Sequence, residues 1–167
     1  MSISSMQFRA SVPLNTTVYD ACPTLKQAHA VNRVDYADMK EDFFWEVFDR
    51  YKKFTCLSVE RFYNIFKSIE YIAKSGLTGD IAKCGVFLGG SIIAAAHFAE
   101  YFGLKGRKYY AFDTFEGFPT NTVKTDISGV SCDLSTLTVF NRNFRHVVEN
   151  NIANSGLDQN QFMLVAG

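Results

Sequence analysis

Apolar residues recur at intervals of three and four along the middle of the chain, which predicts two helices. The clearer helix covers residues 58–76, where one stripe holds Phe62, Ile65, Phe66, Ile69, Ile72 and Ala73. Ser58 can cap its start, and Gly76 is a typical stop. Residues 41–54 carry apolar side chains on more than one side, which indicates a helix buried against other elements. Residues 1–38 show no sustained period, so we expect an irregular amino-terminal arm.

Three short apolar runs alternate with further helical patterns in the rest of the chain. The runs cover residues 81–86, 108–112 and 162–166, and helical segments between them cover residues 91–102 and 141–156. Strands that are joined through helices form a parallel sheet with helices packed on it. The pattern therefore predicts the α/β class with a doubly wound parallel sheet, preceded by the two helices.

Composition narrows the class of protein. The chain has 167 residues, 47% of them apolar, which is enough to bury the core of one domain. Lys plus Arg and Asp plus Glu number 17 each, so no overall charge favours nucleic acid or an anionic membrane surface. The cysteines and histidines do not have the spacing of a zinc site. The start has no apolar segment of a signal peptide, and we expect a soluble, cytoplasmic protein with reduced thiols.

A glycine-rich turn follows the first predicted strand. In residues 79–91, GDIAKCGVFLGGS, glycines at positions 85, 89 and 90 allow a sharp bend and a close approach to the backbone. Asp113 ends the next strand, where such sheets place an acid that accepts ribose hydroxyls. The spacing differs from the dinucleotide pattern GxGxxG. A ligand cradle and a turn that only packs a helix on the sheet both remain open at this point.

Two longer motifs resemble a known family. The chain from Thr55 to Pro119 contains GD-x-x-x-CGV-x-x-GGS and FDTFEGFP, and it is similar to the macrocin O-methyltransferase family of S-adenosylmethionine-dependent enzymes. A weaker similarity covers residues 141–167. The resemblance implies a Rossmann-like class I methyltransferase fold, with strand order 3-2-1-4-5 and the cofactor above the ends of the first two strands. The methyl acceptor implied is a hydroxyl of a sugar or a related natural-product-like small molecule, oriented with the help of Mg²⁺.

The resemblance also implies cofactor-binding positions. Near the methionine end of S-adenosylmethionine it places Phe54 and Thr55. For the glycine-rich wall it implies Lys83, Cys84, Gly85, Val86, Phe87 and Ser91. For the ribose and adenine it implies Asp113, Thr114, Phe115, Glu116 and Gly117.

The chain departs from the family in two respects. The family usually has a glutamate at the position of Lys83, near the ammonium of the cofactor, so we expect Lys83 to weaken binding unless it turns to solvent or to the cofactor's carboxylate. The chain also stops after the third strand, before the family's metal-binding acids and catalytic base. We therefore assign no catalytic residue and no metal ligand. Residues 39–167 are interpreted as the amino-terminal part of a methyltransferase domain, inactive alone, whose oligomeric state stays open.

Other interpretations remain. The chain could be a non-catalytic remnant, or less plausibly a nicotinamide-dependent oxidoreductase, although FDTFEGFP argues against the latter. Cys84 is expected to be a small core residue rather than a nucleophile, and His97 is expected to pack in the core or at its edge. Residues 118–137 suit either a substrate-side lid or a solvated loop, and Glu116 with Asp126 form a carboxylate pair of undefined separation.

Overall fold

The computed structural model describes residues 26, 27, 29–117 and 143–167. Its elements run in the order η2 (Arg33–Tyr36), α3 (Asp42–Tyr51), η3 (Lys52–Phe54), α4 (Val59–Ser75), β1 (Ile81–Cys84), α5 (Gly90–Tyr101), β2 (Tyr109–Asp113), α6 (Arg145–Ala153), η6 (Gln159–Gln161) and β3 (Phe162–Ala166). The predicted helices and strands are thus confirmed within a few residues at each end. Most of the predicted arm, residues 118–137 and Asp126 lie outside the described residues.

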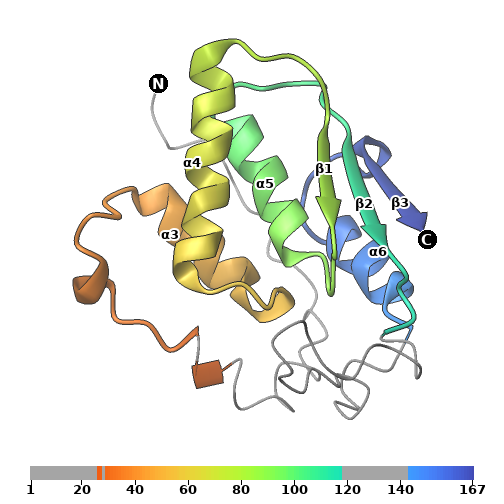
Figure 1. Cartoon of the computed structure of the whole chain (residues 1–167), viewed down its shortest axis with the longest axis horizontal. Coiled ribbons are helices and arrows are strands. Elements are labelled where there is room, and N and C mark those ends of the chain that lie inside the picture. The colour runs from red at the N-terminus through yellow and green to blue at the C-terminus, as the bar shows by residue number, and fades with distance from the viewer. Residues whose placement is uncertain (1–25, 28, 118–142) are drawn as a thin grey trace, which may run out of the picture.

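The described strands form one parallel sheet in the order β1-β2-β3 (Figure 1). Tyr109 of β2 is paired with Ile81 of β1 on one side and with Phe162 of β3 on the other. This order matches the 3-2-1 part of the predicted strand order, and among the described strands β1 and β3 lie at the two edges. The parallel α/β sheet predicted from the sequence is therefore confirmed.

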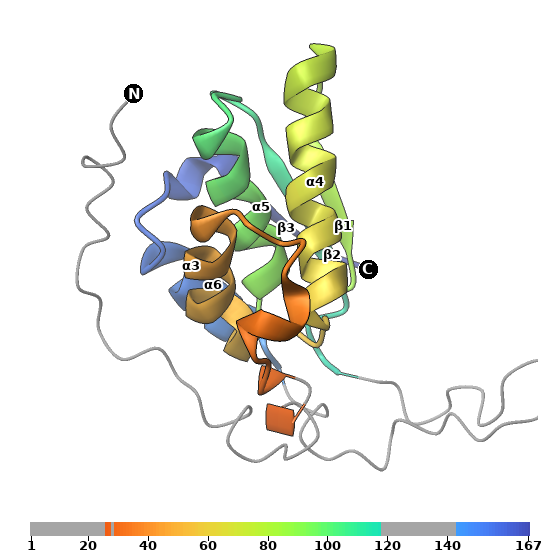
Figure 2. The same ribbon diagram turned by 90° about the vertical axis from the view of Figure 1, so that its left-hand side faces the viewer.

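Helix α5 contacts the sheet through β2, and α3 and α4 pack against α5 (Figures 1 and 2). Aromatic rings fill the space between these helices, and five of the buried ones are Phe44, Phe48, Phe62, Phe66 and Phe98. Helix α5 is buried along almost its whole length, from Gly90 to Ala99. Such a helix is apolar all round because it has neighbours all round. It holds the glycine-rich turn at its amino-terminal end against the core.

The face of the sheet that turns away from these helices is open among the described residues. Ala82 and Cys84 on β1 are exposed, and Phe112 on β2 is 39% exposed. Our expectation of a core position for Cys84 is therefore wrong. Side chains alternate along a strand, so Lys83 lies on the helix side and Cys84 on the opposite side, where no described residue covers it.

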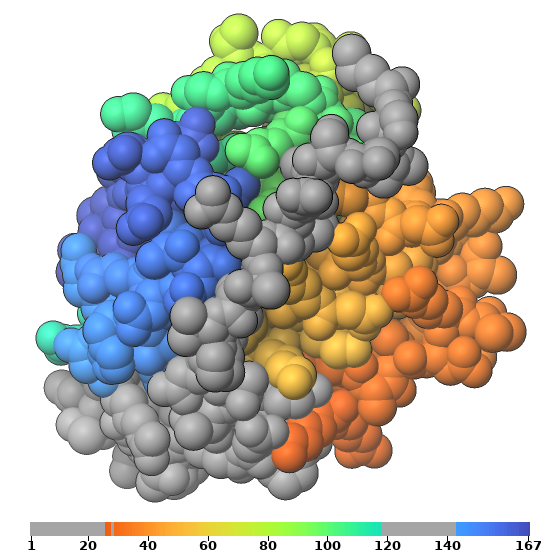
Figure 3. All heavy atoms as spheres, turned by 180° about the vertical axis from the view of Figure 1, so that it is seen from behind, coloured from red at the N-terminus to blue at the C-terminus, as the bar shows by residue number. Residues whose placement is uncertain are grey.

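The end of the predicted arm packs on the core. The side chain of His29 is buried, its Nε2 lies 2.9 Å from the carbonyl oxygen of Leu57, and its ring meets Phe48 edge to face at 6.1 Å. A short 3₁₀ helix, η2, follows it. The boundary drawn before residue 39 stays a prediction, since the described residues on both sides of it contact the same helices. In Figure 3, residues 26–51 in orange and residues 143–167 in blue occupy opposite sides of the molecule.

Gly90 is where α5 meets the end of α3. A Cβ atom on Gly90 would lie 2.7 Å from the carbonyl carbon of Phe54 and 2.7 Å from the carbonyl oxygen of Tyr51. Real Cβ atoms do not approach backbone this closely, so only glycine fits. The sequence left open whether the glycines of this turn make room for a ligand or for packing of the helix. At Gly90 the missing side chain makes room for the protein's own backbone.

A buried polar pair joins the same two helices. The hydroxyl of Tyr51 on α3 lies 2.8 Å from Nε2 of His97 on α5, and both side chains are buried. Burial, with a smaller effect from the charge of Arg50, lowers the pKa of His97 to about 4. Burial also raises the pKa of Tyr51 to about 12. Both groups are therefore neutral near pH 7, and the predicted core position of His97 is confirmed.

We predict that Gly90→Ala lowers the free energy of unfolding by about 2 kcal/mol or more, because the new methyl group meets backbone that cannot rotate away. Gly76→Ala is the control. Gly76 has a φ of +64° and open space around its Cβ position, so this change costs only the left-handed conformation, about 1 kcal/mol. Urea denaturation measures both changes. A loss at Gly90 no larger than that at Gly76 would contradict the close contact.

We also predict that stability falls as the pH drops below about 6.5. The unfolded chain protonates His97 near its ordinary pKa of 6.5, whereas the folded chain keeps it neutral down to about 4. The His97 contribution is therefore complete above pH 6.5 and is lost toward pH 4, about 2 kcal/mol of it by about pH 5. Denaturation above about pH 6.5 and at about pH 5 should show a smaller decrease in the free energy of unfolding for His97→Gln than for wild type. Some decrease should remain in the variant, because it retains His29, whose pKa is also lowered by burial. Equal decreases in the two proteins would exclude His97 as the cause.

Candidate functional site

The carboxyl ends of β1 and β2 lie next to each other and form the candidate site. The turn after β1 stays attached to β2, because the N–H of Gly85 donates to the carbonyl oxygen of Phe112 at 2.9 Å. Gly85 and Gly89 have φ values of +74° and +88°, which reverse the chain between the strand and α5. In parallel α/β sheets, ligands bind in the crevice outside these strand ends. The predicted turn and the predicted acid therefore meet in one place.

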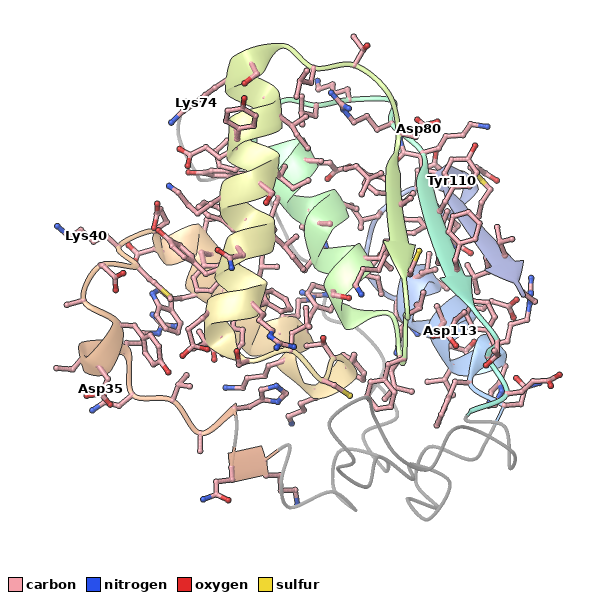
Figure 4. The ribbon with its side chains drawn as sticks, viewed as in Figure 1. Asp35, Lys40, Lys74, Asp80, Tyr110 and Asp113 are labelled. Carbon is pink, nitrogen blue, oxygen red and sulfur yellow. The ribbon has the colours of Figure 1, made fainter. Side chains whose placement is uncertain are left out.

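Asp113 connects the two strand ends through its carboxylate (Figure 4). Its Oδ2 accepts hydrogen bonds from the N–H groups of Val86 at 2.6 Å and Phe87 at 3.1 Å. Its Oδ1 accepts from the N–H of Phe115 at 3.0 Å and lies 3.5 Å from the hydroxyl of Thr114. A carboxylate has about four acceptor positions. Protein backbone takes three of them, so Asp113 has little capacity left for a ligand.

The charge of Asp113 is stabilised by these bonds. Burial pushes the pKa of its carboxyl upward, but the N–H groups of Phe115, Val86 and Phe87 together outweigh burial and leave the pKa below its usual value. Hydrogen bonds to an ionised acceptor are stronger than those between neutral groups. Asp113 is therefore a charged clamp on the turn near pH 7.

Two residues in contact with Asp113 have left-handed backbone. Phe87 has a φ of +53° and Phe115 a φ of +58°, and each donates its N–H to the carboxylate of Asp113. Positive φ is costly for a side chain as large as phenylalanine, and such conformations cluster at functional sites. The bonds to Asp113 hold both residues in place. The rings are also held, since Phe87 meets Phe144 at 5.7 Å and the guanidinium of Arg145 lies 5.6 Å from the ring of Phe115.

Lys83 bends back over the turn. Its Nζ donates to the carbonyl oxygens of Cys84 at 3.0 Å and Gly85 at 2.8 Å. The side chain is half-buried on the helix side of β1. It therefore points neither straight to solvent nor into the apolar core, and its ammonium is held against the backbone of the predicted cofactor wall.

The remaining predicted site residues differ in what they expose. Phe54, Thr55, Val86 and Ser91 are buried, and Thr55 uses its hydroxyl to accept the N–H of Leu57 at 3.2 Å. Thr114 donates to the carbonyl oxygen of Gly117 at 3.1 Å, closing a turn. Glu116 is exposed, and its carboxylate makes no bond to any described residue. Of the two predicted acids, Glu116 is the one whose oxygens are free within the described structure.

A groove runs beside the turn, between α4, β1 and the start of α5. It has a volume of ≈ 400 Å³, and Lys83 and Ser91 line it together with Asp80, Asn64 and Ser68. The α4 residues were not among the predicted site residues. Asn64 and Ser68 are four residues apart, so they share a helix face. This polar pair beside the apolar stripe is the feature of the sequence that could have indicated their place in the groove.

Neither a metal cluster nor a membrane-spanning helix is found among the described residues. Among residues 26–117 without 28 and residues 143–167, no three His, Cys, Asp or Glu side chains gather closely enough to hold a metal ion. None of the described helices is long and apolar enough to cross a membrane. The Mg²⁺ implied by the resemblance therefore has no ligands assigned in the described part of the chain.

Comparison with known proteins gives several methyltransferases to which the chain is similar. The chain is 29% identical over 68 residues to mycinamicin III 3''-O-methyltransferase of Micromonospora griseorubida, a match that covers 41% of this chain and 27% of that protein. The O-methyltransferase NovP aligns with a TM-score of 0.59 and 22% identity, over 68% of this chain and 47% of NovP. The calicheamicin methyltransferase CalS11 aligns with a TM-score of 0.42 and 16% identity, over 100% of this chain and 64% of CalS11.

These comparisons fix the fold and the family. The chain spans about a quarter of the curated relative and about half of NovP. The likeness to NovP shows the Rossmann-like methyltransferase fold, as the sequence predicted. The family model described as Macrocin-O-methyltransferase (TylF) matches residues 12–167, nearly the whole chain. The chain therefore belongs to the macrocin O-methyltransferase family.

Proposed function

We propose that this protein binds S-adenosylmethionine and takes part in methyl transfer to a hydroxyl group of a sugar or related natural product. The observation that carries the proposal is the clamped turn after β1, held against the end of β2 by Asp113, in a chain of this family. The name of the mycinamicin relative, a 3''-O-methyltransferase, supports a hydroxyl acceptor.

The residues at the crevice fit such a cofactor. Adenosine carries ribose hydroxyls, which a carboxylate can accept, and Glu116 has its carboxylate free among the described residues. Asp113 holds Phe87 and Phe115 in left-handed conformations, which fixes the shape of the wall on both sides. We therefore assign Glu116 to the ribose and Asp113 to positioning the turn, whereas the resemblance alone assigned the ribose to both acids and their neighbours.

The reaction itself needs groups beyond those assigned here. S-adenosylmethionine supplies a methyl group on a sulfonium, a good leaving group for attack by an oxygen. The acceptor hydroxyl forms the new O–C bond, the S–C bond breaks, and the hydroxyl proton goes to a base. No described residue is assigned as that base, and Mg²⁺, a cytoplasmic location and an oligomer remain expectations. A non-catalytic remnant would bind the cofactor without turnover.

Glu116→Gln should weaken binding of S-adenosylmethionine about tenfold, because a charge-assisted bond to a ribose hydroxyl is lost. Titration calorimetry of the 167-residue chain measures the affinity. The free energy of unfolding should stay within about 0.5 kcal/mol of wild type, since the carboxylate makes no bond to described residues. Unchanged affinity would remove Glu116 from the site, and no binding by the folded wild-type chain would refute the proposed function.

Asp113→Asn is expected to lower the stability of the fold. The amide keeps the shape of the carboxylate but loses its charge, and in either orientation its NH2 group faces at least one backbone N–H that now donates to Asp113. We expect the free energy of unfolding to fall by about 1–3 kcal/mol. Glu116→Gln removes the same charge three residues later and serves as the matched control in urea denaturation. A loss at Asp113 no greater than at Glu116 would contradict the clamp.

A further inference from the structure

Two backbone carbonyls at the end of β1 form a site for an ammonium group. The carbonyl oxygens of Cys84 and Gly85 lie 3.0 Å and 2.8 Å from the same nitrogen, Nζ of Lys83. These distances are those of ordinary hydrogen bonds from a charged donor. Consecutive carbonyls rarely point to one donor within a regular strand, because its carbonyls alternate in direction. The left-handed Gly85, with a φ of +74°, ends the strand at this point.

The chain's own charges thus engage one backbone group on each of four consecutive residues of the turn. Lys83 takes the carbonyls of Cys84 and Gly85, and Asp113 takes the N–H groups of Val86 and Phe87. The clamp by Asp113 comes from a residue of β2 and is built into the sheet. The contact by Lys83 comes from the residue next to the turn, through a long, flexible and half-buried side chain. A ligand can therefore displace Lys83 more easily than Asp113.

The methionine end of S-adenosylmethionine carries an ammonium group, which needs acceptors of the same kind. Two cations cannot share one pair of carbonyls, because like charges a few ångströms apart repel strongly where solvent is partly excluded. Resting on the proposed function above, we propose that Lys83 occupies the cofactor's ammonium subsite and competes with the cofactor for it. The adjoining groove, which Lys83 also lines, gives the displaced side chain space to enter.

Two ligands separate this competition from other effects of the lysine. S-adenosylhomocysteine, the cofactor without its methyl group, has the ammonium group and a neutral thioether sulfur, whereas 5′-methylthioadenosine keeps the adenosine and a neutral thioether but has neither ammonium nor carboxylate. Calorimetry would compare both ligands on wild type, on Lys83→Met and on Lys83→Arg, which keeps the cation. Lys108→Met is the matched control, since it removes the same charge from an exposed lysine beside the start of β2, at the opposite end of the strands.

We expect Lys83→Met to bind S-adenosylhomocysteine about tenfold more tightly than wild type, with its affinity for 5′-methylthioadenosine unchanged. Lys83→Arg and Lys108→Met should show no such gain. Weaker binding of S-adenosylhomocysteine by Lys83→Met would show that the lysine holds the cofactor's carboxylate, and would overturn the proposal. Parallel changes for both ligands, or no change for either, would overturn it as well. If folded wild type binds neither ligand, the proposed function itself has failed.

Discussion

The candidate site depends on the hydrogen bonds that the carboxylate of Asp113 accepts from backbone N–H groups. These N–H groups come from the turn after β1 and from the turn after β2, so one side chain fixes the relative position of both strand ends. Two phenylalanines with positive φ are held by the same oxygens. An acid at this point of a parallel sheet is usually discussed as a ligand contact. Here its first role is to keep the crevice in shape.

The helical layer fixes the other side of the same turn. Gly90 allows the start of α5 to touch the backbone at the end of α3, and the buried Tyr51–His97 pair joins these helices about two turns further along α5. Burial keeps both groups neutral, so the pair adds a directional contact without a buried charge. The glycine-rich turn is therefore held by a carboxylate on the sheet side and by close helix packing on the other.

The three charged side chains at the crevice differ in whether they are bonded to the protein's own backbone. Asp113 and Lys83 are both engaged with backbone, whereas Glu116 is free among the described residues. A cofactor that enters this site would meet one available carboxylate and one cation already seated on carbonyls. This distribution explains how the turn accommodates a lysine at position 83, because the ammonium of Lys83 is bonded to the carbonyl oxygens of Cys84 and Gly85.

The sequence by itself determined the elements, the parallel sheet and the family, because hydrophobic periodicity and the two motifs are local properties of the chain. It placed Asp113 and the glycines at neighbouring strand ends, since parallel topology brings these ends together. Only the tertiary structure decided what each residue does. The exposure of Cys84 depends on which face of the sheet is covered, and the role of Gly90 depends on a backbone about forty residues away. The bonds of Lys83 and Asp113 depend on the left-handed turn geometry, which residue identity does not specify.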